Sequence, residues 1–344
     1  MKAALEPKLK EYCRVSFKSL LRVLKKHKIK STYRTVRKSS GNKYKKLTRD
    51  NVRRFDVVAV VGPYGTSHSA RKICKRAKVP MFHVQNGFLP DTVIWDIFGF
   101  WGDSPLYKNM GHEIEKFTTA SCQKWSEKYS NHLVNNNSSR RPQPKKTNKV
   151  GKPYVFLPLQ YMIDESILKY GTMKYSLFVK KVAAFCKEKD LVLAIKTHPR
   201  AMVAKPGEKG RIKKLFKALK RDYPDTFRRV KGSIHELSKN SVCMVSMNSA
   251  CIVDGMLNGT ISVECGKTIF SNSGSIIHDK NIEAGLQKCL DLTKKEKNTM
   301  IVKQKAVLYY LYNHYLPLEK NNHKSELSNE QKIENQMRLA KIIK

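Results

Sequence analysis

Short apolar runs that end at polar, glycine-containing loops are the strongest pattern in this sequence. Val57–Val61 leads into the loop Gly62–Ser67, and a later apolar run, Pro80–Val84, leads into Gln85–Pro90. A short helix-like run separates the two pairs. In α/β proteins ligands bind outside the carboxyl ends of the strands, where loops of this kind lie. The pattern predicts an α/β fold with binding loops along one edge of a sheet.

The same alternation continues through the second half of the chain. Apolar runs there have the length and composition of buried strands, and they are separated by segments with helical periodicity. Strands are predicted at 154–159, 191–196, 227–230, 242–245 and 261–264. Helices or helical turns are predicted near 173–187, 212–221, 234–239, 250–257, 282–292 and 296–315. Strands that alternate with helices indicate right-handed β-α-β crossovers and a parallel sheet.

The length of 344 residues predicts about two domains, at roughly 100–200 residues each. Asn, Ser and Pro are concentrated in Asn135–Lys146, a composition that does not build a core and therefore indicates a boundary. The predicted parts are a basic N-terminal extension (1–54), a first domain (55–130), a linker (131–152), a second domain (153–295), and C-terminal helices with a basic tail (296–344).

The formal net charge of +40 is extreme, and much of it precedes residue 55. Such an excess predicts attraction to nucleic acid, anionic lipid or acidic polysaccharide. The alternative is a general basic bias of the source proteome, because Lys and Arg are spread along the whole chain. Residues 15–24 have partial helical periodicity, which fits either a basic helix on an anionic membrane or a helix packed on the first domain. No zinc finger, aromatic RNA-binding motif or helix-turn-helix signal is present.

The chain is expected in the cytoplasm, with a peripheral contact at the inner face of the membrane as a further expectation. No apolar run reaches the roughly 18–20 residues that span a bilayer, and the N-terminus lacks the apolar core of a signal peptide. The eight cysteines form no Cys-x-x-Cys pair and no cluster with zinc-ligand spacing. They are expected to be reduced thiols, and neither a metal nor another cofactor is expected.

Two of the loops that follow predicted strands have a simple structural alternative to a binding role. Gly62–Ser67 lacks the glycine spacing of a P-loop, so it is either a tight turn or a set of N–H groups for an anion. Gln160–Ser166 follows a buried strand and contains Asp164. That carboxylate is suited to act as a nucleophile or base, or to cap the next helix.

Two further loops are suited to hold phosphate. Lys196–Pro199 ends a strand in a defined turn, because proline disfavours helix at His198. A histidine there either donates to a phosphate and moves a proton, or is structural. Ser246–Ala250 joins a strand to a helix, and its Ser and Asn residues either cap that helix or leave its N–H groups for a phosphate.

These motifs together resemble the bacterial capsule polysaccharide biosynthesis proteins, which include the retaining β-Kdo glycosyltransferases. The resemblance covers Val57–Leu106 and Tyr154–Gly274, about half of the chain. Its motifs occur in the family's order. They are Gly65, Ala70-Arg71, Ala77, Gln85–Pro90, Gly99, Ser104, Pro158-Leu159-Gln160, Asp164, Ser166, His198-Pro199, Ser246–Ser249, Asp254 and Gly259.

The resemblance implies a GT-B fold, in which two Rossmann-like domains with parallel sheets face a cleft. A nucleotide-activated sugar, CMP-Kdo in the best-understood members, would bind mainly to the second domain. The implied catalytic residues are Asp164, as nucleophile, and His198. The implied nucleotide-sugar-binding residues are Gln160, Lys196, His198, Ser246, Asn248 and Ser249. The implied acceptor-side residues are Gly65, Gln85, Asn86 and Gly87. No metal is implied, in keeping with the lack of an Asp-x-Asp motif.

One position departs from the family pattern: Gln85 stands where the family usually has an acidic residue. An amide does not accept a proton at neutral pH, so another carboxylate supplies that chemistry or the protein is a slow or inactive member. The leading hypothesis is a glycosyltransferase that moves a Kdo-like sugar acid from CMP to a glycan or glycolipid acceptor. The alternatives are a non-catalytic polyanion-binding protein or inactive homologue, and another phosphate-linked transferase, either sialyltransferase-like or acting on polyol phosphates.

Overall fold

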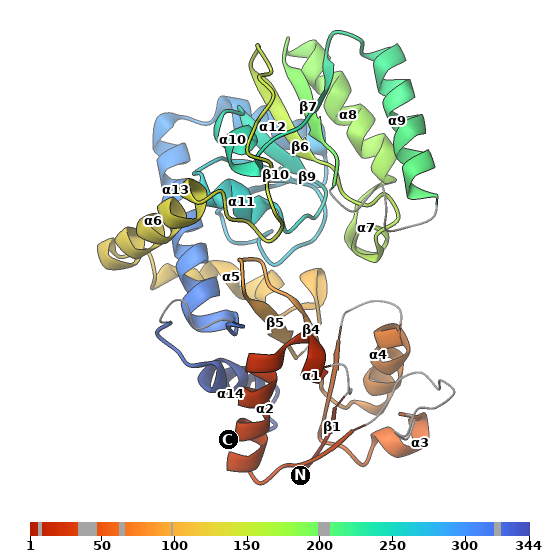
Figure 1. Ribbon diagram of the computed structural model, residues 1–344, viewed down its shortest axis with the longest axis vertical. Coiled ribbons are helices and arrows are strands. Elements are labelled where there is room, and N and C mark those ends of the chain that lie inside the picture. The colour runs from red at the N-terminus through yellow and green to blue at the C-terminus, as the bar shows by residue number, and fades with distance from the viewer. Residues whose placement is uncertain (6–8, 34–46, 62–65, 98, 199–206, 320–324) are drawn as a thin grey trace. The chain divides into compact units, whose positions relative to one another are not determined.

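The chain forms two compact α/β units (Figure 1). The computed structural model describes residues 1–5, 9–33, 47–61, 66–97, 99–198, 207–319 and 325–344. Unit 1 contains Met1–Pro105 and Tyr310–Lys344, and unit 2 contains Leu106–Tyr309. Unit 1 therefore takes in both the predicted N-terminal extension and the end of the predicted C-terminal tail. This division differs from the boundaries that composition suggested.

The sheet of unit 1 has the strand order β2-β1-β3-β4-β5. Its first four strands are parallel and the last is antiparallel to its neighbour. The strands are β1 (Lys2–Leu5), β2 (Lys30–Tyr33), β3 (Val57–Val61), β4 (Met81–Asn86) and β5 (Val93–Asp96). The strands predicted at 57–61 and 80–84 are confirmed by β3 and β4. The segment expected as an extension supplies β1 and β2, because the buried residues of β1 complete the sheet between β2 and β3.

Helices cover both faces of the sheet in unit 1. They are α1 (Leu9–Tyr12), α2 (Arg14–Lys26), α3 (Arg49–Val52), α4 (Thr66–Ala77) and α14 (Asn329–Leu339). On one face α2 packs beside α14, and Phe17 and Met337 share a core with Trp95 (Figure 1). On the other face Val52 and Cys74 pack against β3. The apolar periodicity over residues 15–24 thus forms a helix that packs on its own sheet, while its basic side chains stay exposed.

The sheet of unit 2 has the strand order β11-β10-β9-β6-β7-β8, and all of these strands are parallel. The strands are β6 (Tyr154–Pro158), β7 (Val192–Lys196), β8 (Phe227–Val230), β9 (Cys243–Ser246), β10 (Ser262–Glu264) and β11 (Ile277–His278). The five predicted strands of this half are confirmed, and so is their parallel arrangement. The sequence pattern did not predict the two-residue strand β11.

The helices of unit 2 fall on two sides of its sheet. They are α5 (Leu106–Glu115), α6 (Ala120–Asn135), α7 (Glu165–Tyr170), α8 (Tyr175–Glu188), α9 (Glu208–Asp222), α10 (Ile234–Lys239), α11 (Ile252–Leu257), α12 (Ile282–Asp291) and α13 (Lys294–Tyr310). Helices α8, α9 and α12 share a core with alternate strand residues such as Val155 and Val245. Helix α10 packs on the other face, where Phe156 and Met244 lie.

The segment predicted as a linker, 131–152, begins inside α6 and then packs on unit 2. Ser139 Oγ donates a hydrogen bond of 2.7 Å to Asp254 in α11, and the N–H of Ile234 at the start of α10 donates one of 3.0 Å to Gln143. The Asn and Ser side chains that prevent this segment from forming a core therefore bind polar groups of neighbouring loops and helices. Its composition indicated irregular backbone correctly, but that backbone is held against the unit.

Candidate functional site

The carboxyl edge of the sheet in unit 2 joins two predicted binding loops through a buried amide network. Gln160, after β6, donates from Nε2 to Asn248 Oδ1 at 3.1 Å. Its Oε1 accepts from the N–H groups of Met247 and Asn248 at 3.3 and 3.4 Å. Asn248 in turn donates to the carbonyl of Ser166 at 2.7 Å, at the start of α7. Because both amides are buried, their hydrogen bonds hold the loops after β6 and β9 in one arrangement.

A buried carboxylate, Glu264 at the end of β10, holds the rest of the β9–α11 loop. Its Oε1 accepts from Ser246 Oγ at 2.7 Å and from the N–H of Ser249 at 3.1 Å. Its Oε2 accepts from Thr268 Oγ1 at 2.8 Å. Burial raises the pKa of Glu264 to about 8, against the opposing effect of these hydrogen bonds. No sequence motif assigned a role to this residue, although its place as the acidic last residue of the predicted strand 261–264 was an available signal.

Lys196, the last residue of β7, points to the α10–α11 side of the same edge. Its Nζ donates to Gln143 Oε1 at 2.6 Å. Burial lowers the pKa of Lys196, and nearby Asp254 opposes that shift. Burial also raises the pKa of Asp254, which Ser139 and the positive charges of Arg140 and Lys196 counteract. The edge therefore contains a desolvated lysine beside a largely buried acid, and perturbed groups of this kind are concentrated at functional sites.

His198 lies two residues beyond β7, where its ring centroid is 4.5 Å from that of Tyr161. Tyr161 belongs to the loop after β6, so the structure brings the loops after β6 and β7 together. Pro199, the second residue of the predicted His-Pro motif, lies outside the described residues. His198 is partly exposed.

Asp164 is the N-cap of α7, and its Oδ1 accepts from the N–H of Ser166 at 2.9 Å. The capping interpretation of this residue is confirmed. The same loop is tied to α9, because the N–H of Met162 donates to Glu208 at 2.6 Å. Asp164 is partly exposed, and its Oδ2 has no hydrogen-bond partner among the described residues. Capping and nucleophilic attack therefore use different oxygens and are compatible.

The predicted acceptor-side residues lie in unit 1. Gln85 and Asn86 end β4, where they pair with residues of β5. The N–H of Gly87 donates to the carbonyl of Thr92 at 2.8 Å, and a Cβ at Gly87 would collide with the Thr92 side chain. Glycine is therefore required for this close approach. Gly65, the fourth predicted residue, lies outside the described residues.

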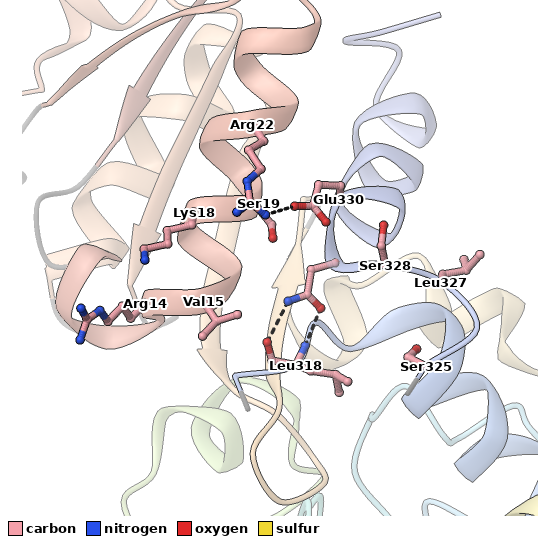
Figure 2. Close-up of a pocket in the computed structure, with 11 residues that line it drawn as sticks. Arg14, Val15, Lys18, Ser19, Arg22, Leu318, Ser325, Leu327, Ser328 and Glu330 are labelled. Atoms are coloured by element: carbon pink, nitrogen blue, oxygen red, sulfur yellow. Dashed lines mark hydrogen bonds and ion pairs between the residues drawn. The ribbon is translucent and has the colours of Figure 1, made fainter. Parts of the chain in front are cut away.

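Unit 1 also contains a basic pocket of about 570 Å³ between α2 and the segment before and at the start of α14 (Figure 2). Arg14, Lys18 and Arg22 follow one another at one-turn intervals along α2. Arg22 forms an ion pair with Glu330 at 2.8 Å, whereas Arg14 and Lys18 have no acidic partner in the part of the chain that the structure describes. Figure 2 shows these two side chains extending from the same side of α2.

Three other properties bear on function. Among the described residues, no group of His, Cys, Asp and Glu side chains is arranged to hold a metal ion. None of the described helices combines the length and apolarity needed to cross a membrane. The eight cysteines are unpaired thiols, and all except Cys251 are buried.

Comparison with known proteins gives matches in structure alone. The sequence matches no protein-family model. It also matches no curated protein sequence. The β-Kdo 2,4-transferase KpsC of Thermosulfurimonas dismutans superposes with a TM-score of 0.61 at 15% identity, over 92% of this chain and 91% of that one. The β-Kdo 2,7-transferase KpsC of the same organism superposes with a TM-score of 0.54 at 15% identity, over 98% of this chain and 99% of that one.

Both superpositions extend over nearly the whole of each chain, and they agree with the two α/β units described above, whose strands are parallel except for β5. The predicted fold class is confirmed: the protein has a GT-B-like fold of two Rossmann-like α/β units, as these β-Kdo transferases have.

Proposed function

We propose that the protein is a glycosyltransferase of capsule or surface polysaccharide biosynthesis that moves a Kdo-like sugar acid from a CMP-activated donor to a glycan or glycolipid acceptor. The carrying observation is the buried network at the carboxyl edge of unit 2, where Gln160 and Asn248 join the loops after β6 and β9. The GT-B-like fold, similar to that of two β-Kdo transferases, supports this proposal.

In this proposal the donor binds over the edge of the sheet in unit 2. Lys196 and His198 supply positive charge and hydrogen-bond donors for the phosphate, and Ser246, Asn248 and Ser249 supply the loop at the start of α11. A nucleotide with one phosphate needs only a few such groups, and no resident metal is part of the proposal. Neutralising the phosphate as it departs stabilises the transition state.

Asp164 is the proposed nucleophile. Its Oδ2 attacks the anomeric carbon while the bond from that carbon to the phosphate oxygen breaks, and CMP leaves with the bonding electrons. An acceptor hydroxyl then attacks the same carbon, the bond to Asp164 breaks, and the hydroxyl proton passes to a base, for which His198 is the candidate. Two displacements retain the configuration of the sugar. Gln85 has no proton-accepting role at neutral pH, so the acceptor-side role proposed for it is limited to hydrogen bonding.

The first experiment measures the thermal stability of the protein with CMP, CDP, UDP and GDP at low and high salt. A ligand that binds only the folded state stabilises it by about 2.7 kcal/mol at a hundred times its Kd. Selective stabilisation by CMP that persists at high salt is expected. A preference for CDP would instead favour a polyol-phosphate transferase. Equal stabilisation by all four nucleotides that disappears in high salt would remove the transferase proposal.

A second candidate function, binding to an anionic surface, is favoured by the basic pocket of unit 1. Arg14 and Lys18 line it without acidic partners among the described residues, and Leu318 and Leu327 add apolar surface. The net charge of +40 would strengthen attraction to any polyanion. Peripheral contact with an anionic membrane is compatible with sugar transfer to a glycolipid acceptor, so both functions could belong to one protein.

Cosedimentation with vesicles tests the second candidate. The double variant Arg14→Gln/Lys18→Gln is compared with Lys25→Gln/Lys30→Gln, which removes the same charge from exposed positions of unit 1 outside the pocket. Binding to anionic but not zwitterionic vesicles is expected, with the larger loss in the pocket variant. Equal losses in both variants would show that net charge alone is responsible. Binding to nucleic acid, if present, would weaken steeply with salt.

A further inference from the structure

The β9–α11 loop of unit 2 is supported from within the protein by one side chain. Glu264 accepts hydrogen bonds from the hydroxyl of Ser246, at the start of the loop, and from the N–H of Ser249, at its end. The register of the sheet explains this contact, because Glu264 on β10 lies directly beside Ser246 on β9. The remaining oxygen accepts from Thr268 and so fixes the rotamer of the carboxyl group.

The surroundings of Glu264 are unusual for an acidic side chain. It is fully buried, and no cationic side chain pairs with it in the described part of the protein. Cys251 and Cys265 lie next to the ends of α11 and β10. The titratable side chains on the elements that pack beside β10 are Cys243 of β9, Asp254 of α11, His278 of β11, and Glu283, Lys288, Cys289 and Asp291 of α12. A buried carboxylate without a cation is costly unless it holds its proton or is fully hydrogen-bonded.

We propose that Glu264 is a positioning residue, which holds the Ser246–Ser249 loop in the geometry that binds the phosphate of the donor. This inference rests on the proposed function, because it assigns donor binding to that loop. Glu264 touches the loop and not the donor. It fixes one backbone N–H and one hydroxyl of the loop. The loop is therefore already ordered in the free protein, and donor binding does not have to supply the cost of ordering it.

The protonation state of Glu264 decides whether it helps or hinders the donor. Burial raises its pKa to about 8, so the neutral form predominates at pH 7. In that form the hydroxyl of Ser246 or of Thr268 turns to accept a hydrogen bond from the carboxylic O–H. Ionisation at higher pH would put a negative charge beneath a phosphate site. The affinity for CMP should therefore fall as the pH rises through about 8. Glutamine at this position keeps the shape and neutrality of the protonated acid and removes that dependence.

The test compares Glu264→Ala and Glu264→Gln with Ser262→Ala, a change at a buried hydroxyl on the same strand. Ser262 Oγ has no hydrogen-bond partner in the described structure, so its loss controls for a change within β10. Calorimetry with CMP at pH 7 is expected to show at least a roughly tenfold loss of affinity for Glu264→Ala, since loop contacts worth one or two hydrogen bonds are lost. Glu264→Gln and Ser262→Ala should stay within about threefold of wild type.

Two further measurements separate positioning from general stability. Amide hydrogen exchange in the free protein should be faster across residues 246–249 in Glu264→Ala, but not in Glu264→Gln. Between pH 7 and pH 9, wild type should lose CMP affinity relative to Glu264→Gln. Because every other titratable group is the same in both proteins, that difference reports Glu264 alone.

Unchanged CMP affinity in Glu264→Ala, or unchanged exchange of the loop, would overturn the inference. Parallel affinity profiles for wild type and Glu264→Gln would overturn the role of its proton. If wild type binds no nucleotide, the proposed function fails, and the exchange comparison still decides whether Glu264 orders the loop.

Discussion

Two carboxylates at the edge of unit 2 have different environments. Asp164 is partly exposed and uses one oxygen to cap α7, so its other oxygen is open to a substrate. Glu264 is fully buried and uses both oxygens for internal hydrogen bonds. Their different environments suit Asp164 to react with a substrate and Glu264 to hold the β9–α11 loop in place.

Replacement of Asp164 by asparagine should separate its two roles. Asparagine is as good an N-cap as aspartate but is not a nucleophile, so Asp164→Asn should abolish transfer while leaving thermal stability unchanged. Asp164→Ala should also abolish transfer and should cost about 1 kcal/mol of stability through loss of the cap. Activity assays and denaturant titrations measure the two effects. Turnover close to wild type in Asp164→Asn would exclude the nucleophile assignment.

Lys332 in α14 should make the stability of unit 1 depend on pH. Its ammonium group is buried and donates to the carbonyls of Tyr312 and Leu316 at 2.6 and 2.9 Å. Burial lowers the pKa of Lys332 from 10.5 to about 7. Between these values the unfolded chain binds a proton that the folded protein does not, so this contribution to stability increases as the pH rises from 7 toward 10.5.

Lys332→Met should remove that slope. The stability of wild type relative to this variant is expected to rise across the window, by at most about 5 kcal/mol at roughly 1.4 kcal/mol per pKa unit. Denaturant unfolding at several pH values, with the exposed Lys25→Met as control, measures it. A constant difference between the two proteins would mean that Lys332 is ionised in the folded state throughout.

Strand β1 is central to the sheet of unit 1, although the sequence pattern does not predict it. Its four residues lie between β2 and β3, and Ala3, Ala4 and Leu5 are buried. A run this short gives no periodicity to measure. Its contribution comes from pairing on both sides with strands that lie far along the chain.

A charge in the middle of β1 should therefore destabilise unit 1. Ala4→Asp places an unpaired carboxylate in a core that contains Val58 and Met81, and we expect a loss of about 3 kcal/mol or more. Lys30→Asp, at an exposed position on β2, should have little effect. Limited proteolysis, which reports each unit by its own fragments, is the measurement. Equal resistance of the Ala4 and Lys30 variants would mean that β1 adds little to the sheet.

For the whole molecule, the dominant physical property is its charge. Sixty-eight Lys and Arg residues face 28 Asp and Glu residues, so most cations have no acidic partner to pair with. Self-repulsion of this kind destabilises the compact state, and salt screens it over a Debye length of about 10 Å at 0.1 M. The basic residues are dispersed over both units. This distribution agrees both with a general basic bias of the source proteome and with binding to a polyanionic partner.

Salt should consequently raise the thermal stability of the free protein. An increase from about 0.05 M to 0.5 M NaCl is expected to raise Tm by several degrees. Salt screens both the repulsion and the surface ion pairs, and the repulsion destabilises the folded state by more than the ion pairs stabilise it. Differential scanning calorimetry gives the result. A Tm that falls with salt would show that ion pairs, such as Arg22–Glu330, outweigh the repulsion.

Most of the secondary structure and the fold class could be predicted from the sequence, because they depend on local patterns. The apolar strands at 57–61 and 154–158 and the helices between later strands were read from periodicity. The cap at Asp164 also came from a local rule. The strands that were missed, β1, β2, β5 and β11, are too short for any periodic signal, so only their strand partners define them.

The sequence by itself determined an α/β protein with polar loops after its strands, since the period of the apolar residues sets both the strands and the places where they end. The tertiary structure decided the rest. It placed α14 beside α2 in unit 1, although more than 300 residues separate the starts of these helices. It also put Glu264 beside Ser246, and Gln143 beside Lys196. Contacts between distant segments depend on strand order and register, which local periodicity does not encode, and so the supports of the site were visible only in the folded chain.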